Sequence, residues 1–224
     1  MNYRLMVFDF DGTLADSMAA SVAIFRKIGP GLGLKPWDDL PAARGMPTRA
    51  MMKAVGITFW KLPKVVREFQ REAAEHASEL KLQPGMAEAL ESLAARVIPL
   101  GILSSNREDN IRKCLAANGV EQLFAFVIGY PHLFGKARAL RRIRRHERIE
   151  RADMIYIGDE SRDVEAAHRA RIAVAAVTWG YHTPELLRGC EPTYLLDAPG
   201  ELLELRSTAQ VPAPAATSSN SGLR

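Results

Sequence analysis

Two aspartates stand at the end of a short apolar run near the N-terminus, within VFDFDGTLADS (residues 7–17). Asp9 and Asp11 follow Leu5–Phe8 with one residue between them, a spacing that directs two side chains of a strand to the same side. Carboxylates at the edge of a core are costly unless a positive charge meets them. The segment therefore predicts a site where a cation or a basic side chain lies against both aspartates.

Polar residues also follow three later apolar runs. They are, in chain order, Ser104, Ser105 and Asn106, then Lys136, then Asp159 and Asp163. In an open parallel sheet, ligands bind beyond the carboxyl ends of the strands, so these groups are expected to meet Asp9 and Asp11 at one edge. Each group alone has an ordinary explanation as a turn, a helix cap or a solvated charge. Their joint occurrence at four strand ends favours a functional site.

The combined residue types indicate phosphate chemistry. Oxygen ligands from several carboxylates favour a hard divalent cation such as Mg²⁺. That cation, Lys136, hydroxyl groups and free backbone N–H groups would all attract a phosphate. One carboxylate held near the phosphorus can then act as a nucleophile through an aspartyl phosphate. A second carboxylate two residues away can protonate the leaving oxygen and later activate water.

Five apolar runs predict the strands that would position these residues. They are largely apolar, as strands covered on both faces are, and they alternate with helical patterns such as Met86–Ala95 and Ile111–Ala117. The predicted strands are Leu5–Phe10, Val97–Leu103, Phe124–Ile128, Met154–Ile157 and Ala173–Thr178. We expect an α/β fold whose core is a doubly wound, Rossmann-like parallel sheet.

The interval between the first two predicted strands is much longer than a βαβ crossover needs. It contains helix-like stretches at residues 19–28, 51–55 and 64–80, with Gly- and Pro-containing loops between them. We therefore predict a small α-helical cap domain at residues 16–81, inserted into a core domain of residues 1–15 and 82–206. Asp16 and Ser17 are predicted to cap its first helix. Residues 207–224 are rich in Ala, Pro and Ser and are predicted to be a disordered tail.

The composition argues against nucleic-acid and membrane partners. The formal net charge of +4 is too mild to indicate a nucleic-acid protein. The basic run at residues 137–151 has no aromatic residues for base stacking and is predicted to be a solvated helix face. No apolar run approaches the ~18 residues of a membrane span. Two distant cysteines and the lack of a signal-peptide pattern favour a reduced, cytoplasmic protein.

Four motifs resemble those of the haloacid dehalogenase-like superfamily of phosphohydrolases. They are DFDGTLADS, ILSSN, FGKARAL and YIGDESRDVEAA, and they occur in this order. The segments LQPGMAEALESLAA and VTWGYHTPELL resemble the phosphoglycolate phosphatase-like branch, which carries a helical cap between the first two motifs. Dehalogenase members lack the second aspartate of the first motif, so Asp11 indicates phosphate chemistry.

The resemblance implies a role for each site residue. Asp9 would be the nucleophile and Asp11 the general acid and base. Mg²⁺ would be held by the Asp9 carboxylate, the Asp11 main-chain carbonyl and Asp159, while Asp163 would lie behind these ligands or hold a metal-bound water. The residues expected around the phosphoryl group are Ser104, Ser105, Asn106, Lys136, Gly12 and Thr13. Glu160 is expected to point to solvent rather than to add an oxygen near the metal.

The predicted function is that of a Mg²⁺-dependent phosphatase acting on a small phosphomonoester, phosphoglycolate-like or a sugar phosphate, through an aspartyl phosphate. Arg44 and Arg49, on a Gly-containing loop of the cap, either reach an anionic group of this substrate or lie on the surface. One alternative is a sugar phosphomutase of the same superfamily, which would keep both aspartates. Another is a catalytically weak protein that senses phosphate or a partner. The sequence selects neither one substrate nor an oligomeric state.

Overall fold

The structure is a computed structural model and describes residues 3–36, 40–130 and 135–206. Its centre is a six-stranded sheet in which every neighbouring pair of strands is parallel. The strands are β1 (Leu5–Phe8), β2 (Leu100–Ser104), β3 (Phe124–Gly129), β4 (Met154–Gly158), β5 (Ala173–Val177) and β6 (Tyr194–Leu196). All five predicted strands are present, and β6 is an additional edge strand.

The strand order is β3-β2-β1-β4-β5-β6. The chain therefore winds from β1 outward on one side, returns, and winds outward again from β4 on the other side. This confirms the predicted doubly wound topology, in which ligands bind at the carboxyl ends near the point where the order reverses. Here that point lies between β1 and β4, the strands that lead directly to Asp9 and Asp159.

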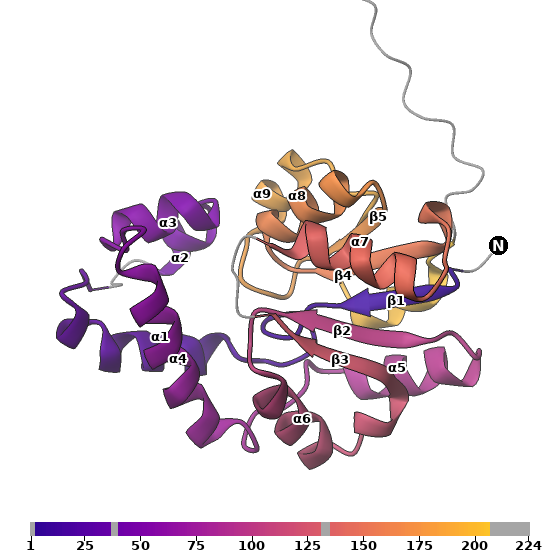
Figure 1. The fold of residues 1–224 in the computed structure, drawn as a ribbon, viewed down its shortest axis with the longest axis horizontal. Helices are drawn as coiled ribbons and strands as arrows, with labels where there is room; N and C mark the ends of the chain where they lie inside the picture. The colour runs from indigo at the N-terminus through magenta and orange to yellow at the C-terminus, as the bar shows by residue number, and fades with distance from the viewer. Residues whose placement is uncertain (1–2, 37–39, 131–134, 207–224) are drawn as a thin grey trace, which may run out of the picture.

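Helices cover both faces of the sheet (Figure 1). On one face lie α5 (Met86–Ala95) and α6 (Glu108–Ala117), which pack on Met6 and Phe8 of β1. On the other face lie α7 (Lys136–His146), α8 (Ser161–Ala170) and α9 (Pro184–Gly189), packed in a second cluster with Leu5 and Val7. Successive side chains of β1 thus enter opposite cores, which explains why the strand has no polar face.

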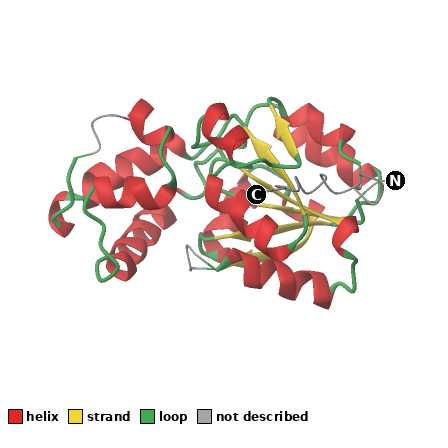
Figure 2. Ribbon diagram, turned by 90° about the horizontal axis from the view of Figure 1, so that it is seen from above, coloured by secondary structure: helices red, strands yellow, loops and turns green. Residues whose placement is uncertain are grey.

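Among the described residues between β1 and α5, four helices form a group beside the sheet, which we call the helical lobe (Figures 1 and 2). They are α1 (Met18–Ile28), α2 (Leu40–Arg44), α3 (Thr48–Ala54) and α4 (Leu62–His76). The lobe has its own small apolar cluster, formed by Phe25, Leu34, Val55 and Val65. Four short 3₁₀ segments complete the described secondary structure: Pro30–Leu32, Glu121–Leu123, Arg151–Asp153 and Pro199–Glu204.

Local details differ from the prediction at the start of α1. Ser17 occupies the N-cap position, but its side chain makes no capping hydrogen bond, and Asp16 is exposed. The Ser17 hydroxyl instead accepts the N–H of Gly12 at 3.2 Å, so it stabilises the turn after β1. The predicted tail at residues 207–224 lies outside the described residues. Within the described part of the chain, every helix is too short or too polar to cross a lipid bilayer.

Candidate active site

The turn that follows β1 begins at Asp9 and lies close to Asp159, which follows β4. The N–H of Asp9 donates to the Ile157 carbonyl at 2.8 Å and so continues the pairing of β1 with β4. The backbone then reverses at Gly12, whose φ of +75° is one that only glycine adopts readily. A Cβ at Gly12 would lie 2.3 Å from Asp159 Oδ2. The glycine is therefore required by both its conformation and this close approach.

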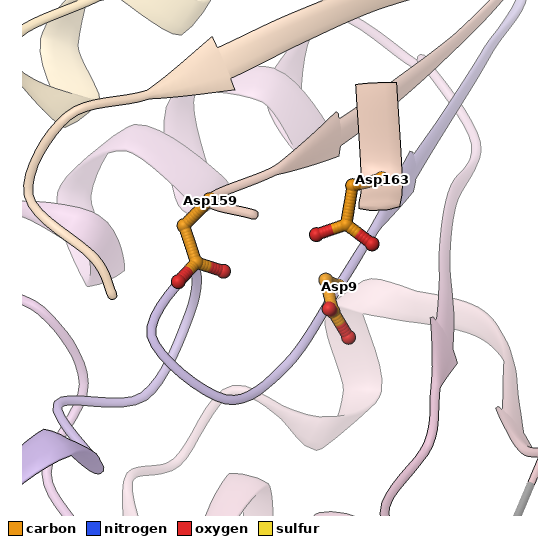
Figure 3. A group of neighbouring side chains, drawn as sticks. All are labelled: Asp9, Asp159 and Asp163. Atoms are coloured by element: carbon orange, nitrogen blue, oxygen red, sulfur yellow. The ribbon is translucent and has the colours of Figure 1, made fainter. Parts of the chain in front are cut away.

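Three buried carboxylates meet beyond the ends of β1 and β4 (Figure 3). They belong to Asp9, Asp159 and Asp163, and one oxygen of each lies within 4.8 Å of the others. Asp163 comes from the first turn of α8, which starts directly after β4. This set offers only oxygen atoms, the ligands of hard divalent cations, so the residues present fit such an ion.

Lys136, at the start of α7, lies between two of these carboxylates. Its Nζ donates to Asp163 Oδ1 at 2.6 Å and also forms an ion pair with Asp9. Only 2% of the lysine side chain is exposed, and its Nζ lies 5.4 Å from the centre of the Tyr156 ring. Burial lowers the pKa of Lys136, but the charges of Asp163 and Asp9 raise it by more. The lysine therefore stays a cation against Asp9.

Asp159 is held by groups from two other loops. The hydroxyl of Thr13 donates to its Oδ1 at 2.7 Å, and the N–H of Tyr181, beyond β5, donates to its Oδ2 at 2.7 Å. Burial, and then the charges of Glu160 and Asp163, raise the pKa of Asp159 well above its usual range. A carboxylate crowded by other negative charges in this way is one that a bound cation would stabilise.

Asp11 lies next to this cluster but in a different environment. Its Oδ2 accepts the side-chain N–H of Asn106 at 3.0 Å, and Asn110 in turn donates to Asn106 Oδ1 at 3.1 Å. Burial raises the pKa of Asp11 to about 6, with the charge of Asp9 as the next cause. A carboxyl group with this pKa can both give and take a proton near neutral pH.

The other predicted phosphate ligands are found at the same strand ends. Ser104 is fully buried and its hydroxyl accepts the N–H of Asn106 at 3.3 Å, whereas Ser105 and Asn106 line a cavity together with Asp11. The Thr13 hydroxyl donates to Asp159, so its predicted contact with phosphate stays a prediction. The parallel sheet therefore brings all the predicted core residues together.

Glu160 does not point to solvent, which makes that expectation wrong. Its side chain is only 13% exposed, accepts the hydroxyl of Thr48 at 2.7 Å and forms an ion pair with Arg162. It also caps α8 in a reciprocal pair of hydrogen bonds with Asp163. Burial raises the pKa of Glu160, but the Arg162 guanidinium lowers it by more, to about 2. The residue after Asp159 therefore joins the core to the helical lobe.

The two cap arginines lie in different places. Arg44 donates from Nε to the Tyr181 carbonyl and from a terminal nitrogen to the Gly180 carbonyl, both at 3.0 Å. It thereby holds α2 on the loop after β5, and it also lines the cavity. Arg49 is exposed on α3 and does not line the cavity. Contact of either arginine with a substrate stays a prediction.

Several residues around the cavity were not predicted from the sequence. They are Thr48, Gln70, Arg162, Tyr181 and His182. Tyr181 and His182 follow β5, so the rule that sites form at carboxyl ends of strands would have found them had it been applied to that strand too. Thr48 and Gln70 belong to the helical lobe, where no comparable rule exists.

Comparisons with known proteins agree with this geometry. The family model of the haloacid dehalogenase-like hydrolases matches residues 6–177. The phosphoglycolate phosphatase of Synechococcus elongatus is 36% identical over 203 residues, 90% of this chain and 96% of that protein. The crystal structure of a predicted phosphatase from Clostridium acetobutylicum has the same fold, with a TM-score of 0.78 and 21% sequence identity. The match covers 92% of this chain and 100% of the Clostridium chain. The fold of a predicted β-phosphoglucomutase from Thermotoga maritima is also similar, with a TM-score of 0.62 and 22% sequence identity. This match covers 91% of this chain and 97% of the Thermotoga chain. The chain belongs to the haloacid dehalogenase-like hydrolases.

Proposed function

We propose that this protein is a Mg²⁺-dependent phosphatase that hydrolyses a small phosphate monoester through a phosphorylated Asp9. The observation that carries the proposal is the position of Lys136, buried between Asp9 and Asp163 in a carboxylate cluster that also contains Asp159. The name of the Synechococcus relative supports phosphate-ester hydrolysis. A phosphoglycolate-like ester or a sugar phosphate is the substrate that the sequence predicts.

The first step would transfer the phosphoryl group to Asp9. An oxygen of the Asp9 carboxylate attacks phosphorus, the bond from phosphorus to the leaving oxygen breaks, and protonated Asp11 gives its proton to that oxygen. The pKa of about 6 supports Asp11 in this role, because part of the population carries the proton near neutral pH. The ammonium group of Lys136 balances charge on Asp9 and on the phosphoryl oxygens.

The second step would return Asp9 to its starting state. Asp11, now a carboxylate, takes a proton from a water molecule, whose oxygen attacks the phosphorus of phospho-Asp9. The bond between phosphorus and the Asp9 oxygen breaks, which releases inorganic phosphate and the free carboxylate. Asn106 orients Asp11 for both proton transfers through its hydrogen bond of 3.0 Å.

Asp9, Asp159 and the Asp11 main-chain carbonyl would hold Mg²⁺, with Asp163 behind them. When bound, Mg²⁺ supplies positive charge that offsets the negative charge of the phosphoryl group. The support for this assignment is the oxygen-only donor set and the mutual distances within 4.8 Å.

The helical lobe would act as a cap domain, residues 16–81, that keeps bulk water from the reaction. Three contacts support this role, because each joins the lobe to a loop at the carboxyl end of the sheet. They are Thr48 to Glu160, Arg44 to the carbonyls of residues 180 and 181, and Gln70 to the Ser105 carbonyl at 2.9 Å.

The variant Asp9→Asn tests the proposed nucleophile. Asparagine has nearly the same shape, so we expect a folded protein that releases no phosphate from p-nitrophenyl phosphate in the presence of Mg²⁺. Mass spectrometry of rapidly quenched wild-type protein should find a phosphoryl group that this variant lacks. Asp16→Asn, which changes an exposed acid on the same loop, is the control and should retain full activity. Substantial turnover by Asp9→Asn would remove Asp9 as the nucleophile.

A sugar phosphomutase is the second candidate, and the similar fold of the predicted β-phosphoglucomutase favours it over other rivals. Such an enzyme would use the same two aspartates but would pass the phosphoryl group back to sugar. It would interconvert sugar phosphate isomers without net phosphate release and would depend on a bisphosphate activator. A sensing protein would instead bind Mg²⁺ and hydrolyse none of a broad panel of metabolites.

A further inference from the structure

A cavity of about 210 Å³ lies between the helical lobe and the carboxyl ends of the strands. Asp11, Ser105 and Asn106 form part of its wall on the core side, so the cavity is continuous with the proposed catalytic site. The wall on the lobe side is mainly apolar. It includes Met51, Met52, Ile57, Leu62, Val66 and Phe69. An organic group attached to a phosphate beside Asp11 would enter this apolar space.

The charged side chains that line the cavity offer little to a second anionic group. Arg44 already donates to two main-chain carbonyls, and Arg162 forms an ion pair with Glu160. The Glu160 carboxylate, also in the lining, would not attract another anion. A carboxylate placed among these apolar side chains would lose its hydration. Arg44, the lining arginine outside that ion pair, is directed to the carbonyls of residues 180 and 181.

The size of the cavity sets the size of the group that fills it. A dry apolar cavity of about 150 Å³ is known to hold one benzene molecule in another protein. A cavity of about 210 Å³ therefore has room for a group of about six carbon atoms or slightly more. Pockets of this kind, apolar with a few polar groups at one end, fix the orientation of a ligand by the polar end.

We infer that the substrate is a phosphate monoester whose organic group is uncharged, largely apolar and about the size of a six-carbon chain or ring. This inference rests on the proposed function and names its substrate class. The phosphate would lie against Lys136 and Asp9, and the apolar group would lie among the side chains of α3 and α4. Phosphoglycolate, with a carboxylate in the same space, would be a poor substrate.

A matched pair of esters tests the charge preference. Isobutyl phosphate has the skeleton of phosphoglycolate with two methyl groups in place of the two carboxylate oxygens. With the full chain and Mg²⁺, released phosphate should show kcat/KM at least about tenfold higher for isobutyl phosphate, because the carboxylate must be desolvated. In the straight-chain series from methyl to hexyl phosphate, kcat/KM should rise about fourfold per methylene, the ratio that corresponds to burial of one methylene group.

Binding provides a second readout. The n-alkylphosphonates cannot be hydrolysed, and their Kd, measured by calorimetry, should fall with chain length in the same way. Val66→Phe would fill part of the cavity and should lower the ratio of hexyl to methyl phosphate kcat/KM about tenfold or more. Arg67→Phe places the same ring on the next, exposed residue of α4 and should leave the ratio unchanged.

The outcomes separate the inference from the proposed function. Turnover of phosphoglycolate equal to or better than that of isobutyl phosphate, or a series that is flat in chain length, overturns the inference and leaves the phosphatase in place. Hydrolysis of a sugar phosphate but of none of these esters also overturns the inference alone. Phosphate release from none of the esters, sugar phosphates and p-nitrophenyl phosphate included, overturns the proposed phosphatase and the inference with it. The wild-type series decides between these results even where Val66→Phe does not fold.

Discussion

Lys136→Met is expected to destabilise the folded protein strongly, because it leaves two buried carboxylates without their cation. The Lys136 side chain and those of Asp9 and Asp163 are each at most 2% exposed, so water cannot replace the lost charge. Methionine has a similar length and keeps the contact with the Tyr156 ring. The change therefore removes mainly the charge and not the packing.

The magnitude follows from the contacts that remain. Removal of one partner from a buried ion pair typically costs about 3–5 kcal/mol. Asp9 keeps the N–H of Phe10 at 2.8 Å, and Asp163 keeps the N–H of Glu160 at 3.2 Å, which favours the lower part of this range. A loss of about 3 kcal/mol is a large share of the about 5–15 kcal/mol by which domains are usually stable. With a urea slope of about 2 kcal/mol/M, the midpoint should fall by about 1.5 M.

Urea unfolding followed by circular dichroism, with EDTA present to remove divalent cations, measures this loss. Lys113→Met, an exposed lysine on α6, is the control and should change the midpoint little. Adding Asp163→Asn to Lys136→Met removes one of the uncompensated charges and should restore part of the stability. If the free energies of unfolding of Lys136→Met and Lys113→Met differ by less than about 1 kcal/mol, the unpaired buried charges cost almost nothing and the prediction is wrong.

Three further predictions concern other parts of the structure. Gly12→Ala should cost at least about 1–2 kcal/mol in urea unfolding and weaken Mg²⁺ binding measured by calorimetry, because the new methyl group meets Asp159 in a left-handed turn. Thr48→Val should speed proteolysis within the helical lobe, whereas Thr48→Ser should not, because the hydroxyl bond to Glu160 holds the lobe on the core. Burial raises the pKa of Cys114 to about 11, so only about one Cys114 thiol in a thousand is ionised at pH 8. Ellman's reagent should therefore modify Cys114 only after unfolding, and rapid reaction of Cys114 in the native protein would contradict its burial.

The sheet could be predicted from the sequence because its inner strands are covered on both faces. Residues of β1 alternate between two cores, so all four are apolar and the run stands out from the helical patterns around it. The edge strand β6 was not predicted. It has three residues, of which only Leu196 is buried, and so it lacks the continuous apolar run that marks the other strands.

The core half of the site could be predicted for a topological reason. A parallel sheet brings the carboxyl ends of its strands to one edge, so polar residues after β1, β2, β3 and β4 were expected to meet there. The partners of single hydroxyl groups could not be predicted in the same way. Thr13 contacts Asp159 only because the turn at Gly12 directs it there, and Thr48 contacts Glu160 only because the lobe lies over α8. Neither arrangement leaves a periodic pattern in the sequence.

The first turn of α8 connects the carboxylate cluster to the helical lobe. One carboxylate oxygen of Asp163 accepts a hydrogen bond from the Glu160 N–H, and the other accepts a hydrogen bond from Nζ of Lys136. The same lysine also forms the ion pair with Asp9. The Glu160 side chain accepts the N–H of Asp163 and also the hydroxyl of Thr48 in α3. A displacement of the lobe that moves Glu160 must therefore disturb the same turn that positions the lysine against Asp9. Glu160, which the sequence alone assigns to the surface, thus connects the position of the helical lobe to the charge balance of the proposed nucleophile.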